Sequence, residues 1–306
     1  MKLILSKPRG FCAGVVRAIQ TVERALEIFG APVYVKHQIV HNQHVVLRLE
    51  KKGAIFIEDV LSVPFGSVLI YSAHGVSLEV KEEAKTRGLK EIDATCSLVT
   101  RIHSAVIRFA NKGYKIILIG HKNHVETIGT YGQVPDQTVI VETLEDVDQL
   151  DFREDQKLFF ITQTTLSVDD VQELTLALYK KYPNIETLPT SSICYATTNR
   201  QVALKQIALE ADLILVVGDE RSSNSNRLVE VAKSQGKKSY LIHDAHAIDP
   251  SWFENIEVIG LTAGASTPED VCQSCVERLS SLFDLQVEEV ELLKEEVFFQ
   301  LPRQLI

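Results

Sequence analysis

Short apolar runs alternate with helix-like stretches along the whole chain, and this alternation is the feature that most constrains its fold. Runs such as Lys115–Ile119 and Leu213–Val217 are rich in Ile, Leu and Val, and each ends in a cluster of small or polar residues before apolar side chains recur at helical spacing. Strands that alternate with helices in this way are typical of parallel sheets covered by helices. We therefore predict an α/β fold in which ligands bind outside the carboxyl ends of the strands.

The cysteines suggest an internal threefold repeat. Cys12, Cys96 and Cys194 each fall in a predicted strand-to-helix turn, and polar loop residues follow each cysteine at similar offsets: first His41, His124 and Asn224, then His74, Thr164 and Ser266. We expect three small α/β units, related by a pseudo-threefold axis that brings the three thiols to one point. The predicted units span residues 1–95, 96–193 and 194–283, and residues 284–306 form a tail that docks on the body.

Composition and charge exclude several classes of protein. The chain has 306 residues and a net charge of −9, so its overall field attracts neither nucleic acid nor an anionic membrane. Its aliphatic runs are far shorter than the ~20 residues of a membrane-spanning helix, and the apolar patch Leu3–Leu5 is too short for a signal peptide. We expect a cytoplasmic protein with no nucleic-acid or membrane partner, in which any anionic ligand is bound by local donors.

Three converging cysteines without a fourth indicate a metal site with one open position. A closed structural zinc or cluster site would use four protein ligands. Three thiolates on a 4Fe-4S cluster leave one iron for a substrate, whereas a zinc ion can also be held by three cysteines and a water molecule. The spacing does not choose between the two metals.

Polar loops elsewhere in the chain predict a phosphate site. His41, His74 and His124 each follow a predicted strand, and Ser222-Ser223-Asn224 follows an apolar run and opens a helix. Hydroxyls, an amide and free backbone N–H groups at a helix start suit a phosphate, although the same cluster is also a common N-cap. Glu126, two residues after His124, is a candidate proton donor, with a solvated loop glutamate as the alternative.

Cys272 and Cys275 look like a redox pair but have a simpler explanation. Together with Val271, Val276 and Leu279 they trace one face of a predicted helix. We predict that these two thiols pack in the core.

Seven motifs, taken in order, resemble the 4-hydroxy-3-methylbut-2-enyl diphosphate reductase family of the methylerythritol phosphate route to isoprenoids. The resemblance runs from Met1 to about Leu301. The motifs are Pro8-Arg9-Gly10-Phe11-Cys12-Ala13-Gly14-Val15, Ser72-Ala73-His74-Gly75-Val76, Asp93-Ala94-Thr95-Cys96, Thr162-Gln163-Thr164-Thr165-Leu166-Ser167-Val168, Cys194-Tyr195-Ala196-Thr197-Thr198-Asn199-Arg200-Gln201, Ser222 to Arg227 and Thr262-Ala263-Gly264-Ala265-Ser266.

The resemblance implies a trefoil of three α/β units around a central 4Fe-4S cluster, whose open iron meets the substrate hydroxyl. It also implies electron transfer from ferredoxin or flavodoxin, and isopentenyl and dimethylallyl diphosphates as products. Thr164 would contact the substrate oxygen and Glu126 would deliver protons. The remaining implied roles are cluster ligands for Cys12, Cys96 and Cys194, and diphosphate binding for His41, His74, His124, Ser222, Ser223, Asn224 and Ser266.

Two positions depart from the family pattern, and two other functions stay open at this stage. The family usually has proline where this chain has Ser97, after Cys96, and Val125, after His124. Losing a proline frees the backbone of a loop without removing a ligand. The alternative functions are a three-thiolate zinc hydrolase and a non-enzymatic iron-sulfur carrier or sensor.

Overall fold

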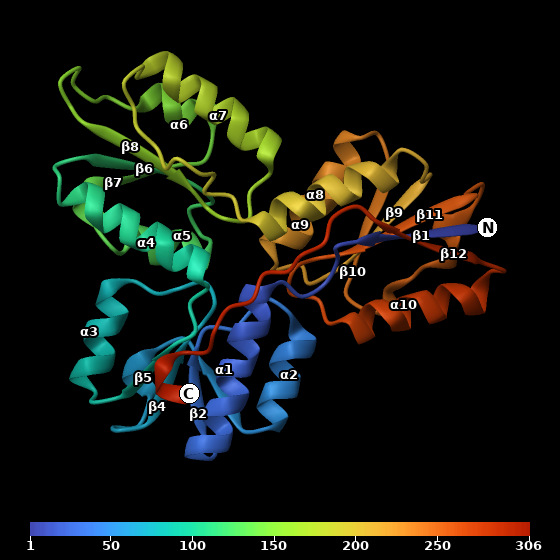
Figure 1. The fold of residues 1–306 in the computed structure, drawn as a ribbon, viewed down its shortest axis with the longest axis horizontal. Helices are drawn as coiled ribbons and strands as arrows, with labels where there is room; N and C mark the ends of the chain where they lie inside the picture. The colour runs from blue at the N-terminus through green and yellow to red at the C-terminus, as the bar shows by residue number, and fades with distance from the viewer. The chain divides into compact units, whose positions relative to one another are not determined.

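Three parallel sheets form the framework of the protein (Figure 1). The computed structural model describes residues 1–306. The chain forms two compact units, each built from separate segments. Unit 1 comprises Met1–Val16, His41–Val46 and Tyr195–Phe298, and unit 2 comprises Arg17–Val40, Leu47–Cys194 and Phe299–Ile306.

Unit 1 contains a five-stranded sheet in the order β10-β9-β11-β1-β12. Its helices cover both faces: β1 directs Leu3 toward α10 and Ile4 toward α8 and α9. Burial on both faces explains why the central strands are almost continuously apolar. The bounds are β1 Lys2–Lys7, β9 Leu213–Val217, β10 Lys238–Ile242, β11 Val258–Ala263, β12 Gln286–Glu291, α8 Tyr195–Ala208, α9 Ser223–Ser234 and α10 Glu269–Leu282, with 3-10 turns at Ala245–Ala247 and Pro250–Phe253.

Unit 2 contains two smaller sheets, in the orders β3-β2-β4-β5 and β7-β6-β8. The strands are β2 Val33–Lys36, β3 Ala54–Ile57, β4 Val68–Tyr71, β5 Lys90–Asp93, β6 Lys115–Ile119, β7 Thr138–Val141 and β8 Leu158–Thr162. The helices are α3 Leu78–Thr86, α4 Ser97–Ala110, α5 Val125–Tyr131, α6 Leu144–Gln149 and α7 Val168–Lys181, with 3-10 turns at Val60–Ser62, Pro135–Gln137 and Arg303–Leu305. Two helices, α1 Ala13–Phe29 and α2 Gln43–Lys51, begin in unit 1 and continue into unit 2.

The predicted α/β class with several small parallel sheets is confirmed, but both ends of the chain pair differently from the predicted division. We assigned β1 to the first unit, whereas it pairs with β11 and β12 in the sheet of the C-terminal third. The segment from residue 284 onward, predicted as a tail that docks on the body, begins as strand β12 in the same sheet as β1. The reason is that the buried backbone N–H and C=O groups of β1 need hydrogen-bond partners on both edges of the strand, and β11 and β12 supply them. The four-part division itself stays a prediction. None of the helices has both the length and the apolar character needed to cross a membrane.

Candidate active site

Cys12 lies in unit 1, in the turn between β1 and α1. Its N–H donates to the Ala265 carbonyl at 3.1 Å, and its carbonyl accepts from the Val16 N–H at 3.0 Å. Cys12 therefore occupies the N-cap position of α1. Gly10 precedes it with φ of +67°, and a Cβ there would lie 3.2 Å from the Thr267 carbonyl oxygen, so the turn requires glycine.

Cys96 and Cys194, in unit 2, also precede helices. Cys96 is the N-cap of α4, and its N–H donates to the Ala73 carbonyl at 2.9 Å. Cys194 is the last residue before α8, and its N–H donates to the Thr164 carbonyl at 3.0 Å. A helix N-terminus carries a partial positive charge, which suits a negatively charged metal thiolate at that position.

The other two cysteines differ in their surroundings. None of the five forms a disulfide, but Cys12, Cys96 and Cys194 are partly exposed, whereas Cys272 and Cys275 are buried. The latter two pack in the apolar cluster beneath α10, and burial raises the pKa of each thiol to about 12. The prediction that this pair is core is confirmed.

Glu126 and Thr164 form a buried pair in unit 2. Glu126 was predicted in a loop, but it lies in the first turn of α5, with only 4% of its surface exposed. Its carboxylate accepts the backbone N–H of Thr164 at 2.6 Å and the Thr164 hydroxyl at 2.8 Å. Burial raises the pKa of Glu126 to about 7, because it outweighs the opposing effect of these two hydrogen bonds. The solvated-glutamate alternative is therefore wrong.

Two of the predicted phosphate-binding histidines lie together in unit 2. The rings of His74 and His124 meet edge to face with centroids 6.1 Å apart. His124 is the N-cap of α5, and its Nδ1 accepts from the Glu126 N–H at 3.2 Å. In the neutral ring the proton then resides on Nε2, which makes Nε2 a hydrogen-bond donor. His74 Nδ1 lies 3.3 Å from the Ser72 hydroxyl.

Unit 1 gathers a second group of predicted site residues around Ala265. The carbonyl of Ala265 holds the Cys12 N–H, while its own N–H donates to Asn224 Oδ1 at 2.8 Å. The next residue, Ser266, donates its hydroxyl to the His41 carbonyl at 2.9 Å. One short loop thus connects Cys12, His41, Asn224 and Ser266.

Ser222 and Ser223 open helix α9. Ser222 is its N-cap and accepts the Ser225 N–H at 3.3 Å, and Ser223 is its first residue. The capping function that we considered for this cluster is therefore present. The partial positive charge of this helix N-terminus also favours an anion.

Sequence reasoning missed Asp219, which joins two of these loops in unit 1. Its carboxylate accepts the Gln43 N–H at 2.9 Å and the Arg221 side chain at 2.9 and 3.0 Å. Burial alone would raise the pKa of Asp219, but the hydrogen bonds from Arg221 and Gln43 lower it to about 2. An acidic residue one position beyond the glycine that ends the Leu213–Val217 run was the available signal.

Gln163, in unit 2, was quoted only as part of a motif but organises the loop before Thr164. Its Oε1 accepts the His121 N–H and the Thr127 hydroxyl, both at 3.1 Å, and its Nε2 donates to the Thr165 hydroxyl at 2.8 Å. All of its polar atoms are used, so the amide orients the loop.

The predicted residues thus form two groups, each within one unit. Unit 1 holds Cys12, His41, Ser222, Ser223, Asn224 and Ser266, and unit 2 holds His74, Cys96, His124, Glu126, Thr164 and Cys194.

Comparison with known proteins identifies the family. The family model described as LytB protein matches residues 3–280. A relative from Protochlamydia amoebophila (strain UWE25), described as 4-hydroxy-3-methylbut-2-enyl diphosphate reductase, is 63% identical over 306 residues, which cover 100% of this chain and 98% of the relative. A relative of the same description from Chlamydia pneumoniae is 58% identical over 99% of this chain and 98% of its own length.

Solved structures agree with the sequence relatives. The E-1-hydroxy-2-methyl-but-2-enyl-4-diphosphate reductase from Plasmodium falciparum matches with a TM-score of 0.96 and 48% identity, covering 99% of this chain and 96% of that one. A structure described as (E)-4-hydroxy-3-methyl-but-2-enyl diphosphate reductase, the terminal enzyme of the non-mevalonate pathway, matches with a TM-score of 0.66 and 32% identity over 92% of this chain and 100% of that one. The chain therefore belongs to the LytB protein family, whose relatives found here are 4-hydroxy-3-methylbut-2-enyl diphosphate reductases.

Proposed function

We propose that the protein catalyses the reductive dehydroxylation of 4-hydroxy-3-methylbut-2-enyl diphosphate, the last step of the methylerythritol phosphate pathway. Two electrons and two protons enter, the hydroxyl leaves as water, and the allylic group is protonated at either end to give isopentenyl or dimethylallyl diphosphate. Family membership supports this reaction. The observation that supports it best is the hydrogen bonding of Thr164. Its N–H and hydroxyl donate to the buried carboxylate of Glu126, and its carbonyl accepts the Cys194 N–H.

We propose a 4Fe-4S cluster bound by Cys12, Cys96 and Cys194. Each of the three cysteines suits a cluster ligand, because each is outside a disulfide, partly exposed and placed at a helix start. Three thiolates leave one iron without a protein ligand. When bound, the cluster supplies the reducing electrons and an open iron position.

The diphosphate is bound, in this proposal, by His41, His74, His124, Ser222, Ser223, Asn224 and Ser266. The Nε2–H of His124 and the N–H groups at the start of α9 are donors of the kind that phosphate oxygens accept. Because the protein has a net charge of −9, local donors rather than the overall field must hold the anion.

Proton delivery falls to Glu126 and Thr164. A carboxyl with a pKa of about 7 is partly protonated at neutral pH, so it can give a proton and be reloaded. The Thr164 hydroxyl, 2.8 Å from the carboxylate, contacts the substrate oxygen and passes the proton on.

We further propose ferredoxin or flavodoxin as the electron donor. The motif resemblance supports this donor class. Cysteines outside disulfides fit a reducing compartment such as the cytoplasm, which we propose as the location.

Anaerobic spectroscopy tests the function. We expect the reconstituted protein to be brown, to contain iron and sulfide, and to change its spectrum when 4-hydroxy-3-methylbut-2-enyl diphosphate is added. With a chemical reductant it should form both products. A colourless protein with one stoichiometric zinc would overturn the proposal in favour of a zinc hydrolase. A cluster whose spectrum does not change when the diphosphate is added would overturn the proposal in favour of an electron carrier.

A further inference from the structure

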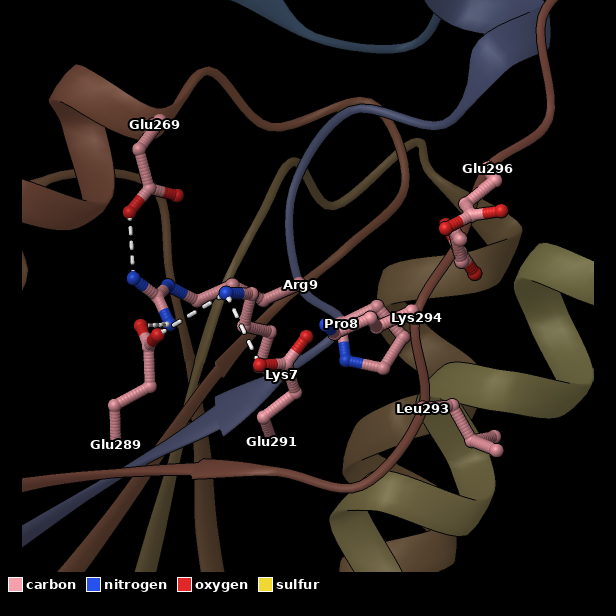
Figure 2. A pocket seen from close by; sticks show the side chains of 10 residues that line it. Lys7, Pro8, Arg9, Glu269, Glu289, Glu291, Leu293, Lys294 and Glu296 are labelled. Atoms are coloured by element: carbon pink, nitrogen blue, oxygen red, sulfur yellow. Dashed lines mark hydrogen bonds and ion pairs between the residues drawn. The ribbon is translucent and has the colours of Figure 1, made fainter.

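The C-terminal segment lies along the loop that leads to Cys12. Strand β12 pairs in parallel with β1 as far as Lys7 and Glu291, and the Leu292 N–H then donates to the Lys7 carbonyl at 3.0 Å. Beyond this point Leu293–Glu296 and the Lys7–Arg9 loop line a cavity of about 500 Å³ (Figure 2). Residues 286–296 are therefore an integral part of unit 1.

Arg200 connects this segment to the Cys12 loop. Its side chain is fully buried, with 0% of the residue exposed. Its Nε and Nη2 donate to the Gly10 carbonyl at 3.2 and 2.7 Å, and its Nη1 donates to the Ala196 carbonyl at 2.9 Å. The charge is balanced by Glu295, 3.0 Å from Nη1, which also accepts the Asn199 amide at 3.0 Å. A buried arginine requires such a partner, because an uncompensated charge is strongly unfavourable there.

Arg17 makes the corresponding connection within unit 2. Its Nη1 donates to the Thr95 carbonyl at 2.9 Å, one residue before Cys96, and its Nη2 donates to the Asp93 carbonyl at 3.3 Å. Its Nε donates at 2.7 Å to the carbonyl of Gln300, five residues beyond Glu295 in the chain. Each arginine thus binds a carbonyl just before a cysteine and a group of the C-terminal segment.

We infer that the segment Leu292–Gln300, which we call the brace, supports the two cysteine turns separately. Arg200, paired with Glu295, is a positioning residue for the Cys12 turn in unit 1. Arg17, bonded to the Gln300 carbonyl, is a positioning residue for the Cys96 turn in unit 2. This inference rests on the proposed function only in taking those cysteines as cluster ligands. Gly10 lacks a Cβ and can adopt many backbone conformations, so neighbouring contacts are needed to fix its turn at the observed positive φ. Without Glu295, the Arg200 guanidinium would lose its counter-charge and turn toward water, and both hydrogen bonds to the Gly10 carbonyl would be lost.

Hydrogen exchange on the cofactor-free protein tests the brace directly. We expect Glu295→Gln to speed amide exchange in residues 10–14 about tenfold, which corresponds to about 1.4 kcal/mol. Exchange in β6 and β8 should stay unchanged. The matched control is Glu288→Gln, in the preceding strand β12, because the Glu288 side chain forms a surface ion pair with Lys2. Glu295→Asp should restore much of the protection.

Arg17→Lys supplies a second, independent variant. It keeps the positive charge but cannot bind three carbonyls in one plane, so exchange should rise in residues 94–98 and not in residues 10–14. Its control is Arg153→Lys, whose ion pair with Asp155 is exposed. If both brace variants exchange like their controls, the inference is overturned.

Cluster retention gives the functional readout. After anaerobic reconstitution, a chelator should remove iron about tenfold faster from Glu295→Gln than from Glu288→Gln. Equal rates would overturn the role at the cluster. Failure of the proposed function gives a different result from failure of this inference. The parent protein itself would then bind no cluster, whereas the exchange experiment would still test the brace.

Discussion

Glu126 accepts both the backbone N–H and the hydroxyl of Thr164, at 2.6 and 2.8 Å, although 38 residues separate the two in the chain. These bonds join the start of α5 to the residues that follow β8. They bury a carboxyl group beside the loop that holds Cys194.

Glu126→Gln should lower turnover by about 10² to 10⁴ while leaving substrate binding largely intact. Glutamine keeps the shape but cannot donate a carboxyl proton. Turnover would be measured anaerobically with a chemical reductant, so that docking of the natural donor plays no part. Glu142→Gln is the control, because Glu142 pairs with His121 at a partly exposed position. Near-normal turnover at matched iron content would remove Glu126 from the mechanism.

Serine at Cys12, Cys96 or Cys194 should deplete iron and abolish activity. Serine at Cys272 or Cys275 should leave both nearly intact and instead lower the free energy of unfolding by about 1–3 kcal/mol, because a hydroxyl replaces a buried apolar thiol. Iron analysis and urea unfolding separate the two effects. The ligand assignment fails if a Cys272 variant loses its iron while a Cys96 variant keeps a full complement.

Alanine at His41 or His74 should weaken diphosphate binding by about 1.5–3 kcal/mol, since each change removes a donor to a charged oxygen. The cluster spectrum without substrate should stay unchanged. Titration calorimetry under anaerobic conditions measures the affinity, and His246→Ala, at an exposed 3-10 turn, is the control. Unchanged affinity in both variants would count against the phosphate site.

Two buried groups should give the free energy of unfolding opposite pH dependences. Burial raises the pKa of Glu126 from 4.5 to about 7, so the folded state holds this proton more tightly and stability falls as pH rises through that range. Burial, aided by Lys81 and opposed by Asp93, lowers the pKa of His103 from 6.5 to about 4, so stability falls as pH drops through that range.

Variants separate these two contributions. Relative to the parent, Glu126→Gln should gain about 3 kcal/mol of stability between pH 4 and pH 8, and His103→Gln should show the opposite trend. Urea unfolding across this range, in one cofactor state, measures both. A difference from the parent that is independent of pH in either variant would contradict the assigned protonation.

Proline at Ser97 or Val125 should stabilise the protein by about 0.4–1 kcal/mol. Both are first residues of helices, where proline is favoured, and the preceding Cys96 and His124 have ψ of 135° and 136°, as a residue before proline requires. Thermal unfolding checks the gain. Loss of stability at either position would show that the backbone there is not preorganised for proline.

Local patterns determined the α/β class and the cysteine turns. Apolar periodicity and the polar residues at strand ends are properties of neighbouring residues, so the positions of Cys12, Cys96 and Cys194 before helices were predictable. The resemblance motifs likewise lie in continuous stretches such as Pro8-Arg9-Gly10-Phe11-Cys12.

Only the tertiary structure decided pairing and burial between distant segments. β1 lies between β11 and β12, which are more than 250 residues away in the chain. The apolar pattern of β1 does not predict which strands pair with it. The sequence predicted Glu126 as a proton donor with a solvated glutamate as the alternative, and only its burial against Thr164 excluded the alternative. Arg200 was noted only as part of the motif that begins at Cys194. Its burial and its ion pair with Glu295 in the tail could not be predicted from that motif. Such effects depend on desolvation and charge compensation, which arise only when residues remote in sequence exclude water from each other.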